Sequence, residues 1–350
     1  MPKTGASPFR SLEKRERRAV QVSSQDLVAV QPLLPGRAIP MAVRPAISGV
    51  DLCAWATENR EFIEQQLFRH GALLFRGFGP FTPEQFERFA EATSTGGLID
   101  YQYASTPRHR IKGRIYSSTE YPPDQAIPMH NEMSYAASWP GKIWFCCLKA
   151  SLQGGETPIA DSARVLERID ASIQARFQER GVSYVRNYRD HVDLSYANVF
   201  GTEDRAEIEK FCQTAQIECE FGPDRQLRTR QRCSAIAIHP GKKRPVWFNQ
   251  AHLFHISSLE PAVADSLLSE FGEAGLPRNA YYGDGSKIET SDLDAIREAY
   301  RQEMVVFSWN EGDILMLDNM RVAHGRQPFS GERKVIVAMA EQISADAPSR

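Results

Sequence analysis

Two strand-rich segments, separated by a long stretch of mixed character, most constrain how this 350-residue chain can fold. The first covers residues 114–161 and the second residues 303–344, and both consist of short runs rich in β-branched and aromatic residues. Neither segment shows the regular alternation of strands with helices that a parallel sheet needs for its crossovers. We therefore predict antiparallel pairing in a mainly β fold with helices (α+β), whose core is a single β-sandwich.

Helical and irregular segments surround this predicted sandwich. Helical periodicity covers residues 56–69 and residues 82–93, and the second of these begins with a Thr-x-x-Gln capping pattern. Residues 1–45 are expected to form a partly extended N-terminal arm, and residues 46–350 a single domain. Residues 190–300 mix helical pieces with short strands, so we expect an insertion or lid there.

Composition and charge favour a globular protein that acts on small molecules. The chain is 42% hydrophobic and 25% charged with a formal net charge of −2, so no global attraction to nucleic acid or to an anionic membrane is expected. No apolar run approaches the roughly 18 residues of a membrane span, and no secretory signal is recognisable. The six cysteines form no C-x-x-C pair and are expected to be buried thiols. Together these features predict a cytoplasmic protein.

A His-x-acid pattern occurs twice, at residues 130–132 and at residues 191–193. Eight histidines and 44 acidic residues predict roughly one such pattern by chance, so the pattern alone identifies no site. The first lies in the run "IPMHNEMSY", which alternates like a β-strand. Because residues i and i+2 of a strand point to the same side, His130 and Glu132 can converge on one ion while Asn131 faces away.

A third ligand must come from a distant segment, and His324 in "LDNMRVAHGRQPF" is the candidate. Two imidazoles and one carboxylate on one face of a metal leave adjacent coordination positions open, which is diagnostic of non-haem Fe(II) oxygenases. Arg333 starts the last strand, where alternation places it in phase with Val335 and Val337. A guanidinium at this position can bind a carboxylate through two parallel hydrogen bonds.

Together with the "GGET" motif that contains Thr157, these residues resemble the Fe(II)/2-oxoglutarate-dependent dioxygenases of the taurine dioxygenase (TauD/TfdA) superfamily. The stretches "TEYPPDQAIPMHNEMSY", "GGETPIAD" and "WFNQAHLFH" are similar to those of the SyrP-like amino-acid hydroxylases of natural-product pathways. The resemblance covers roughly residues 65–342, and its motifs are ordered and spaced as in the superfamily.

The resemblance implies a double-stranded β-helix, or jelly roll, in which His130, Glu132 and His324 hold iron. It also implies that Thr157 and Arg333 bind the distal carboxylate of the co-substrate 2-oxoglutarate. With O₂, such an enzyme forms succinate and CO₂ and hydroxylates an unactivated C–H bond. The expected substrate is a small molecule, an amino acid or a derivative of one, either free or presented on a carrier protein. Desaturation and epoxidation by the same chemistry stay open.

Two departures from the family pattern refine this expectation. Most of the superfamily carries aspartate where this chain has Glu132, although SyrP-like members accept glutamate. Related halogenases replace the carboxylate with alanine or glycine to admit chloride, so Glu132 favours hydroxylation. The taurine enzymes place a sulfonate-binding arginine four residues after the co-substrate arginine. Val337 stands at that position here, so a sulfonate substrate is not expected.

Other histidines support competing interpretations. His191 and Asp193 lie in a charged segment with no Gly-Gly-x-Thr motif after them, so a surface or lid position is expected for them. His252 and His255 could share one face of a helical turn, but without a third ligand a structural or lid-hinge role is favoured over zinc binding. Two other functions stay open: a catalytically silent jelly roll that binds a small acid or a metal, and a zinc hydrolase.

Overall fold

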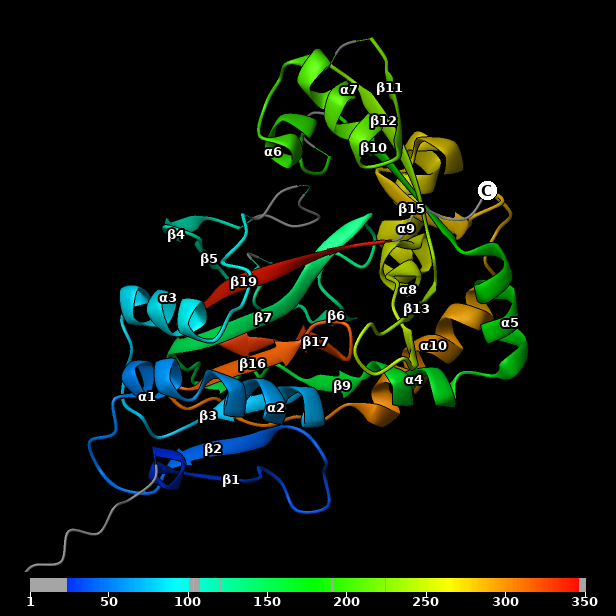
Figure 1. Cartoon of the computed structure of the whole chain (residues 1–350). Helices are drawn as coiled ribbons and strands as arrows, with labels where there is room; N and C mark the ends of the chain where they lie inside the picture. Colours follow the sequence, from blue (N-terminus) through cyan, green and yellow to red (C-terminus); the bar gives the residue numbers. More distant parts are fainter. Residues whose placement is uncertain are drawn as a thin grey trace, which may run out of the picture.

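The larger of two β-layers is an eight-stranded sheet with the order β1-β2-β3-β16-β7-β19-β5-β4 (Figure 1). The computed structural model describes residues 24–100, 103, 108–119, 121–189, 192–223 and 225–345. Neighbouring strands in this sheet are antiparallel, except for the parallel pair β2 and β3. The strands are β1 (Val28–Pro32), β2 (Met41–Pro45), β3 (Ala72–Phe75), β4 (Arg110–Lys112), β5 (Ile115–Ser117), β7 (Ser138–Lys149), β16 (Ile314–Asp318) and β19 (Lys334–Ser344).

The second layer consists of a three-stranded sheet, β6-β17-β9, and a short pair, β18-β8. Apolar side chains of β7, β16 and β19 meet those of β9 and β17 in one core between the layers. Antiparallel pairing within a sandwich confirms the predicted α+β jelly-roll architecture. The strands of this layer are β6 (Ile127–His130), β8 (Gln153–Gly154), β9 (Ile159–Asp161), β17 (Val322–Arg326) and β18 (Phe329–Ser330).

Three helices cover the outer face of the large sheet: α1 (Leu52–Glu58), α2 (Arg60–His70) and α3 (Pro83–Ala92). The single helix predicted over residues 56–69 is wrong, because Asn59 ends α1 and precedes α2 with backbone angles outside the helical region. The predicted capping box of α3 is present, since the Thr82 hydroxyl and the Gln85 side chain each accept the other's backbone N–H.

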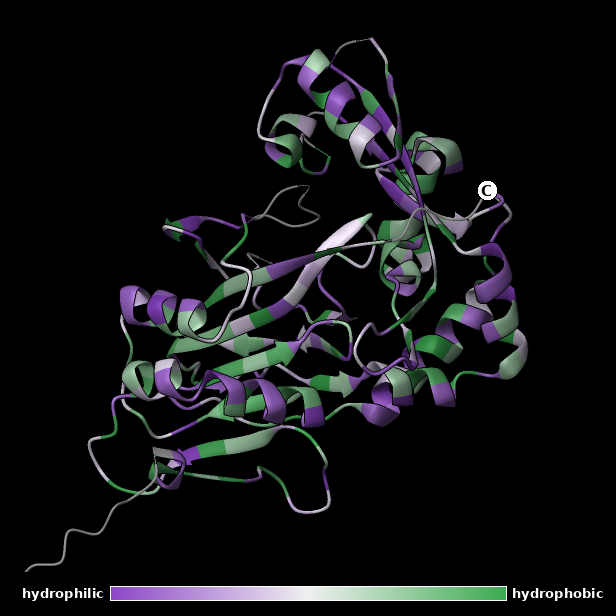
Figure 2. Ribbon diagram, viewed as in Figure 1, coloured by the Kyte–Doolittle hydropathy of each residue, from purple (hydrophilic) through white to green (hydrophobic). Residues whose placement is uncertain are grey.

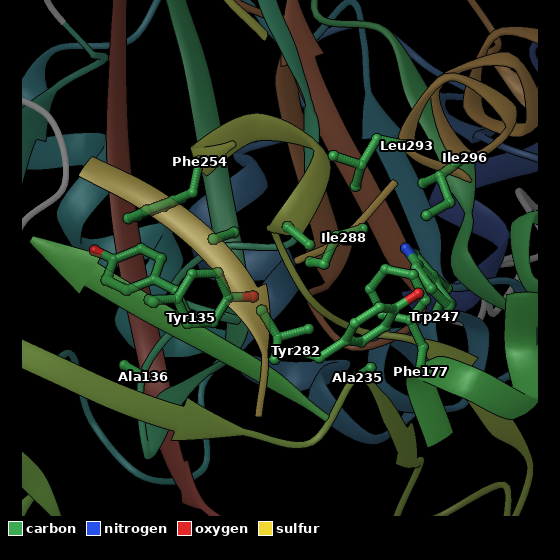
Figure 3. Close-up of a cluster of buried hydrophobic side chains, with 14 of the residues drawn as sticks. Tyr135, Ala136, Phe177, Ala235, Trp247, Phe254, Tyr282, Ile288, Leu293 and Ile296 are labelled. Carbon is green, nitrogen blue, oxygen red and sulfur yellow. The ribbon is translucent and has the colours of Figure 1, made fainter. Parts of the chain in front are cut away.

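The segment between the two halves of the sandwich builds its own sheet, β11-β12-β10-β15, and most of the remaining helices. Its core joins several elements: Phe177 of α5 packs against Trp247 of β14 and Tyr282 of β15, at 5.1 Å between ring centroids in both cases (Figure 3). Tyr135, close to the predicted metal ligands, packs against Phe254 of α8 at 5.2 Å. This segment therefore contacts the sandwich where the candidate site lies. Its elements, with the flanking helices, are α4 (Ser162–Arg168), α5 (Ala171–Arg180), β10 (Val182–Tyr188), α6 (Tyr196–Phe200), α7 (Arg205–Thr214), β11 (Ile217–Phe221), β12 (Leu227–Cys233), β13 (Ile236–Ile238), β14 (Pro245–Trp247), α8 (Ala251–Phe254), α9 (Pro261–Phe271), β15 (Arg278–Tyr282) and α10 (Thr290–Glu303).

Two strand predictions are wrong in extent. Residues 303–309 form no strand, and Val305 makes a single bridge to Ile159. The run "IPMHNEMSY" is extended only as far as His130, where β6 ends and a turn follows. Within the predicted N-terminal arm, residues 28–45 supply β1 and β2 of the large sheet.

Hydropathy follows these layers (Figure 2). Hydrophobic residues concentrate in the strands of the sandwich, and hydrophilic residues lie along the outer helices. Cys146 and Cys147 illustrate the alternation, because the first packs in the core under α1–α3 and the second in the core between the layers. Of the other cysteines, Cys212 is buried and the remaining three are half-buried. Within the described residues, no helix is both long and apolar enough to cross a membrane.

Candidate metal and co-substrate site

The predicted histidine ligands lie opposite each other on neighbouring strands. His130 at the end of β6 is the register partner of His324 in β17, and their ring centroids are 4.6 Å apart. The His130 Nδ1 lies 2.8 Å from the carbonyl oxygen of Pro128. A carbonyl can only accept, so Nδ1 carries the hydrogen and Nε2 keeps its lone pair for a metal. Sheet pairing thus brings together two imidazoles that are far apart in sequence.

Glu132 completes the group from the turn after β6. One ligand atom from each of His130, Glu132 and His324 lies within 4.8 Å of the others, and the Glu132 Oε2 is 3.7 Å from the His324 Nε2. Because Glu132 lies beyond the end of β6, strand alternation does not orient its side chain. Asn131 nevertheless faces away from Glu132. The Asn131 amide is buried and donates to the Ser162 hydroxyl, at 3.0 Å.

Side chains from distant segments hold the backbone of this turn. The Glu132 N–H donates to the Asn319 Oδ1 at 2.7 Å, and the Asn319 Nδ2 donates to the Glu132 carbonyl at 2.9 Å. Gln250 donates to the Asn131 carbonyl at 2.9 Å, and the His252 Nε2 lies 2.9 Å from the carbonyl oxygen of Met129. These side chains supply hydrogen bonds that a neighbouring strand would supply if β6 continued.

Charge in the site favours a metal-binding protonation state. Burial, and then the neighbouring His324, lower the pKa of His130 to about 4, so this imidazole is neutral at physiological pH. Burial alone would raise the pKa of Glu132, but Arg108 and the two imidazoles hold it well below its usual value. The Arg108 Nη2 donates to the Glu132 Oε2 at 2.7 Å, and both side chains are buried.

A second cluster, around Arg333, fits a carboxylate. The Arg333 Nε donates to the Gly155 carbonyl at 2.8 Å, while Nη1 and Nη2 lie 3.4 Å from the hydroxyls of Ser118 and Thr157. The Trp309 indole N–H also donates to the Thr157 Oγ1, at 3.1 Å. Since both neighbours donate to this oxygen, the hydroxyl hydrogen of Thr157 is left to donate to a further acceptor.

The guanidinium of Arg333 stays charged in this setting. Burial, and then the nearby Arg326, lower its pKa to about 10, which is still above physiological pH. Val335 and Val337 lie in the core between the layers, as predicted. Arg333 does not start the strand, however, because β19 begins at Lys334 and its register shifts between Lys334 and Val335. One cavity joins this cluster to the histidines, and it is lined by Arg108, Ser118, Thr119, Ile127, His130, Phe145, Thr157, His324, Gly325, Arg326 and Arg333.

The competing histidines do not form a metal site within the described residues. His191 lies outside them, and Asp193 makes an ion pair with Arg278, at 2.6 Å. His252 is buried and stacks on Tyr300 with ring centroids 4.9 Å apart, whereas His255 caps the turn that follows α8. Their structural role was predicted, but not that His252 contacts the backbone next to His130.

Several residues of the site escaped prediction. Asn319 directly follows β16 in the quoted "LDNMRVAHG" stretch, so its place before the His324 strand was a usable signal. Ser118 directly follows β5, as part of "RIYSSTEY". Arg108 carries no pattern that separates it from other loop arginines. Its role depends on a contact that only the folded chain shows.

The donor set fits a non-haem iron ion. His130 offers a neutral Nε2, Glu132 an ionised carboxylate, and His324 lies opposite on β17, which together give the facial two-histidine, one-carboxylate arrangement. The second cluster offers a guanidinium and hydroxyls at one end of the same cavity, as a dicarboxylate co-substrate would require.

Comparisons with known proteins agree with this geometry. Residues 29–339 match the taurine catabolism dioxygenase TauD, TfdA family. The chain is 42% identical over 316 residues to the dapdiamide synthesis protein DdaC of Enterobacter agglomerans, covering 87% of this chain and 96% of that protein. It is 28% identical over 318 residues to a clavaminate synthase-like protein of Arabidopsis thaliana, covering 88% of this chain and 92% of that one.

Solved structures support the fold. The crystal structure of PvcB from Pseudomonas aeruginosa superposes with a TM-score of 0.54 at 16% identity, covering 91% of this chain and 93% of that one. A likeness at this identity concerns the fold alone. The family match over most of the chain and the identity to DdaC, taken with the site geometry, show that the chain is an Fe(II)/2-oxoglutarate-dependent dioxygenase of the TauD, TfdA family.

Proposed function

We propose that this dioxygenase hydroxylates an unactivated C–H bond of an amino acid or an amino-acid-derived small molecule in natural-product biosynthesis. In this proposal His130, Glu132 and His324 hold Fe(II), and Thr157 and Arg333 bind the distal carboxylate of 2-oxoglutarate. The observation that carries the assignment is the convergence of the three ligand atoms within 4.8 Å of one another. Bound iron, with 2-oxoglutarate and O₂, would supply the oxidising chemistry.

The protein's own residues bind and orient the reactants. The Pro128 carbonyl fixes the His130 ring, and Asn319 fixes the backbone of Glu132, so both ligands are pre-organised. Arg333 would pair with the co-substrate carboxylate, while the Thr157 hydroxyl donates a further hydrogen bond to it. Phe145 packs against the His324 ring at 4.9 Å and helps to exclude water from the metal side of the cavity.

Three observations support the substrate class. DdaC is a dapdiamide synthesis protein, so the identity to it supports a role in the biosynthesis of a small natural product. The carboxylate ligand Glu132 is retained, which favours oxygen transfer over halogenation. Val337 is fully buried in the core between the layers, so its position supplies no cation for a sulfonate.

Anaerobic loading with Fe(II) and 2-oxoglutarate tests the proposal. Wild-type protein should develop a metal-to-ligand charge-transfer absorption band and, after O₂ is admitted, release succinate. Glu132→Ala should lose both, while Glu303→Ala, which removes a carboxylate that pairs with Arg164 and Arg168 and does not line the cavity, should retain both. Failure of the wild-type protein to bind iron would sink the proposal. Metal-dependent hydrolysis that persists without O₂ would support the zinc hydrolase instead.

Perturbation of the same absorption band also identifies substrates. Free amino acids and their derivatives form the first panel, and carrier-bound amino acids the second. The mass of the product then separates the reactions, because hydroxylation and epoxidation add an oxygen atom whereas desaturation removes two hydrogens. Binding of iron and 2-oxoglutarate without turnover of any compound in either panel would count against the substrate class proposed.

A further inference from the structure

Three arginines line the cavity beside the candidate metal ligands, and no acidic residue is among its described lining residues. Arg326 is held by the backbone, because its two terminal nitrogens donate to the carbonyls of Tyr121, Pro122 and Gln125, at 2.9, 2.6 and 2.7 Å. Arg333 is proposed above to bind the co-substrate. Arg108 pairs with Glu132, and a divalent cation at the ligands would bring the positive charge of this region above what Glu132 and 2-oxoglutarate neutralise, so the cavity should accept a further anionic group.

Arg108 pairs with the Glu132 oxygen that also lies nearest His324. Its Nη2 donates to the Glu132 Oε2, which is also the oxygen 3.7 Å from the His324 Nε2. This oxygen is therefore the one placed to share a cation with His324. A Glu132 carboxylate that coordinates a divalent cation has less negative charge left for Arg108, and the cation adds a positive charge close to the guanidinium.

We propose that Arg108 anchors a carboxylate of the organic substrate beside the metal, and that its ion pair with Glu132 is the resting position of this anchor. The inference rests on the proposed function. A guanidinium is planar and pairs with a carboxylate through two parallel hydrogen bonds, so it would orient as well as bind the substrate. Arg108 and Glu132 are both buried, so the pairing would take place in a site shielded from water.

The proposal narrows the substrate class. An amino acid or peptide with a free carboxylate can form an ion pair with Arg108. A compound whose carboxyl group is bound in a thioester cannot, because it carries no charge there. The alternative is that Arg108 is a positioning residue, which keeps hold of Glu132 when the metal is bound. The two roles differ in what happens to metal affinity and to anion binding when the guanidinium is removed.

Paramagnetic relaxation provides the test, with acetate as the anion probe. Full-length protein is saturated with Mn(II) and 2-oxoglutarate, and the relaxation of the methyl protons of acetate is compared with that of uncharged acetamide. Wild-type protein should relax acetate but not acetamide. Arg108→Met should lower the relaxation of acetate at least about tenfold, as expected for loss of a charged, bidentate hydrogen-bonded pair. Arg108→Lys should lie between the two.

Controls separate the possible outcomes. Arg110→Met removes a nearby arginine that is exposed and paired with Asp100, and it should behave as wild type. Equal relaxation of acetate in wild type and Arg108→Met, or none in wild type, overturns the proposal. Metal affinity reduced tenfold or more in Arg108→Met, with acetate binding intact at saturating Mn(II), assigns the positioning role instead. Relaxation of the 2-oxoglutarate protons reports on the proposed function separately, so its failure is distinguishable.

Discussion

Protonation of His252 should lower the free energy of unfolding of the metal-free protein as the pH falls. This side chain is 2% exposed, its Nε2 contacts the Met129 carbonyl, and it stacks on Tyr300. Burial lowers its pKa from 6.5 to about 3. The unfolded chain therefore binds a proton at His252 more readily than the folded chain does. The contribution to stability is complete above pH 6.5 and is lost as the pH falls from there toward 3.

The linkage relation gives the size of this effect. Between pH 7 and pH 5, the unfolded histidine becomes almost fully protonated while the buried one stays neutral, which costs about 2 kcal/mol of unfolding free energy. The substitution His252→Gln removes the titrating group but keeps an N–H donor for the Met129 carbonyl. The loss of stability over this pH range should therefore be about 2 kcal/mol smaller in His252→Gln than in wild type.

Urea unfolding at pH 7 and pH 5, followed by tryptophan fluorescence, measures the difference. A chelator must be present, because protons also compete with any metal bound at His130. His109→Gln, at an exposed position, controls for the exchange of a histidine for glutamine. If His252→Gln loses as much stability as wild type between the two pH values, His252 is not held neutral in the folded protein and the reasoning is wrong.

Three further substitutions test the construction of the site. Asn319→Asp keeps an acceptor for the Glu132 N–H but loses the donor to its carbonyl, so metal affinity measured by titration should fall about 10-fold or more. Trp309→Phe removes the donor to Thr157 and should weaken 2-oxoglutarate binding in calorimetry while metal affinity is unchanged. Gly325→Ala would place a Cβ 2.7 Å from a carbonyl oxygen of β6, and it should lower the unfolding free energy by about 1–3 kcal/mol in urea titrations.

Sequence reasoning found the candidate ligands because each is tied to a strong local pattern. His324 lies in a strand and His130 ends one, and the order of the motifs along the chain limits which strands can pair. The Glu132 assignment identified a residue that does join the group, but for the wrong geometric reason, since β6 ends before it. In "IPMHNEMSY" the two-residue alternation continues for several residues after the strand hydrogen bonds of β6 end. Such a pattern therefore cannot mark the residue at which a strand stops.

Contacts between side chains and distant backbone could not be predicted in the same way. Asn319 lies 187 residues from Glu132. Its side-chain amide pairs with both the N–H and the carbonyl of Glu132, but no periodic pattern in the sequence marks this residue. Arg108 pairs with Glu132 from a loop that lies 24 residues before it in the sequence. In both cases the polar side chain is positioned by a shape that exists only after the sheets have paired. Sequence patterns therefore predict strand pairing more readily than they predict the side chains that support the ligands.

The supporting contacts also show how the segment between the two halves of the sandwich takes part in the site. The Met129 and Asn131 carbonyls, on either side of His130, are bonded by His252 and Gln250, which both come from around α8. Without that segment these two carbonyls would lose their partners in a buried environment, at a cost of about 1–3 kcal/mol each. The sandwich supplies the ligands, but this segment holds the backbone that presents them. A substitution in α8 can therefore alter metal binding without touching a ligand, which the order of segments along the chain does not reveal.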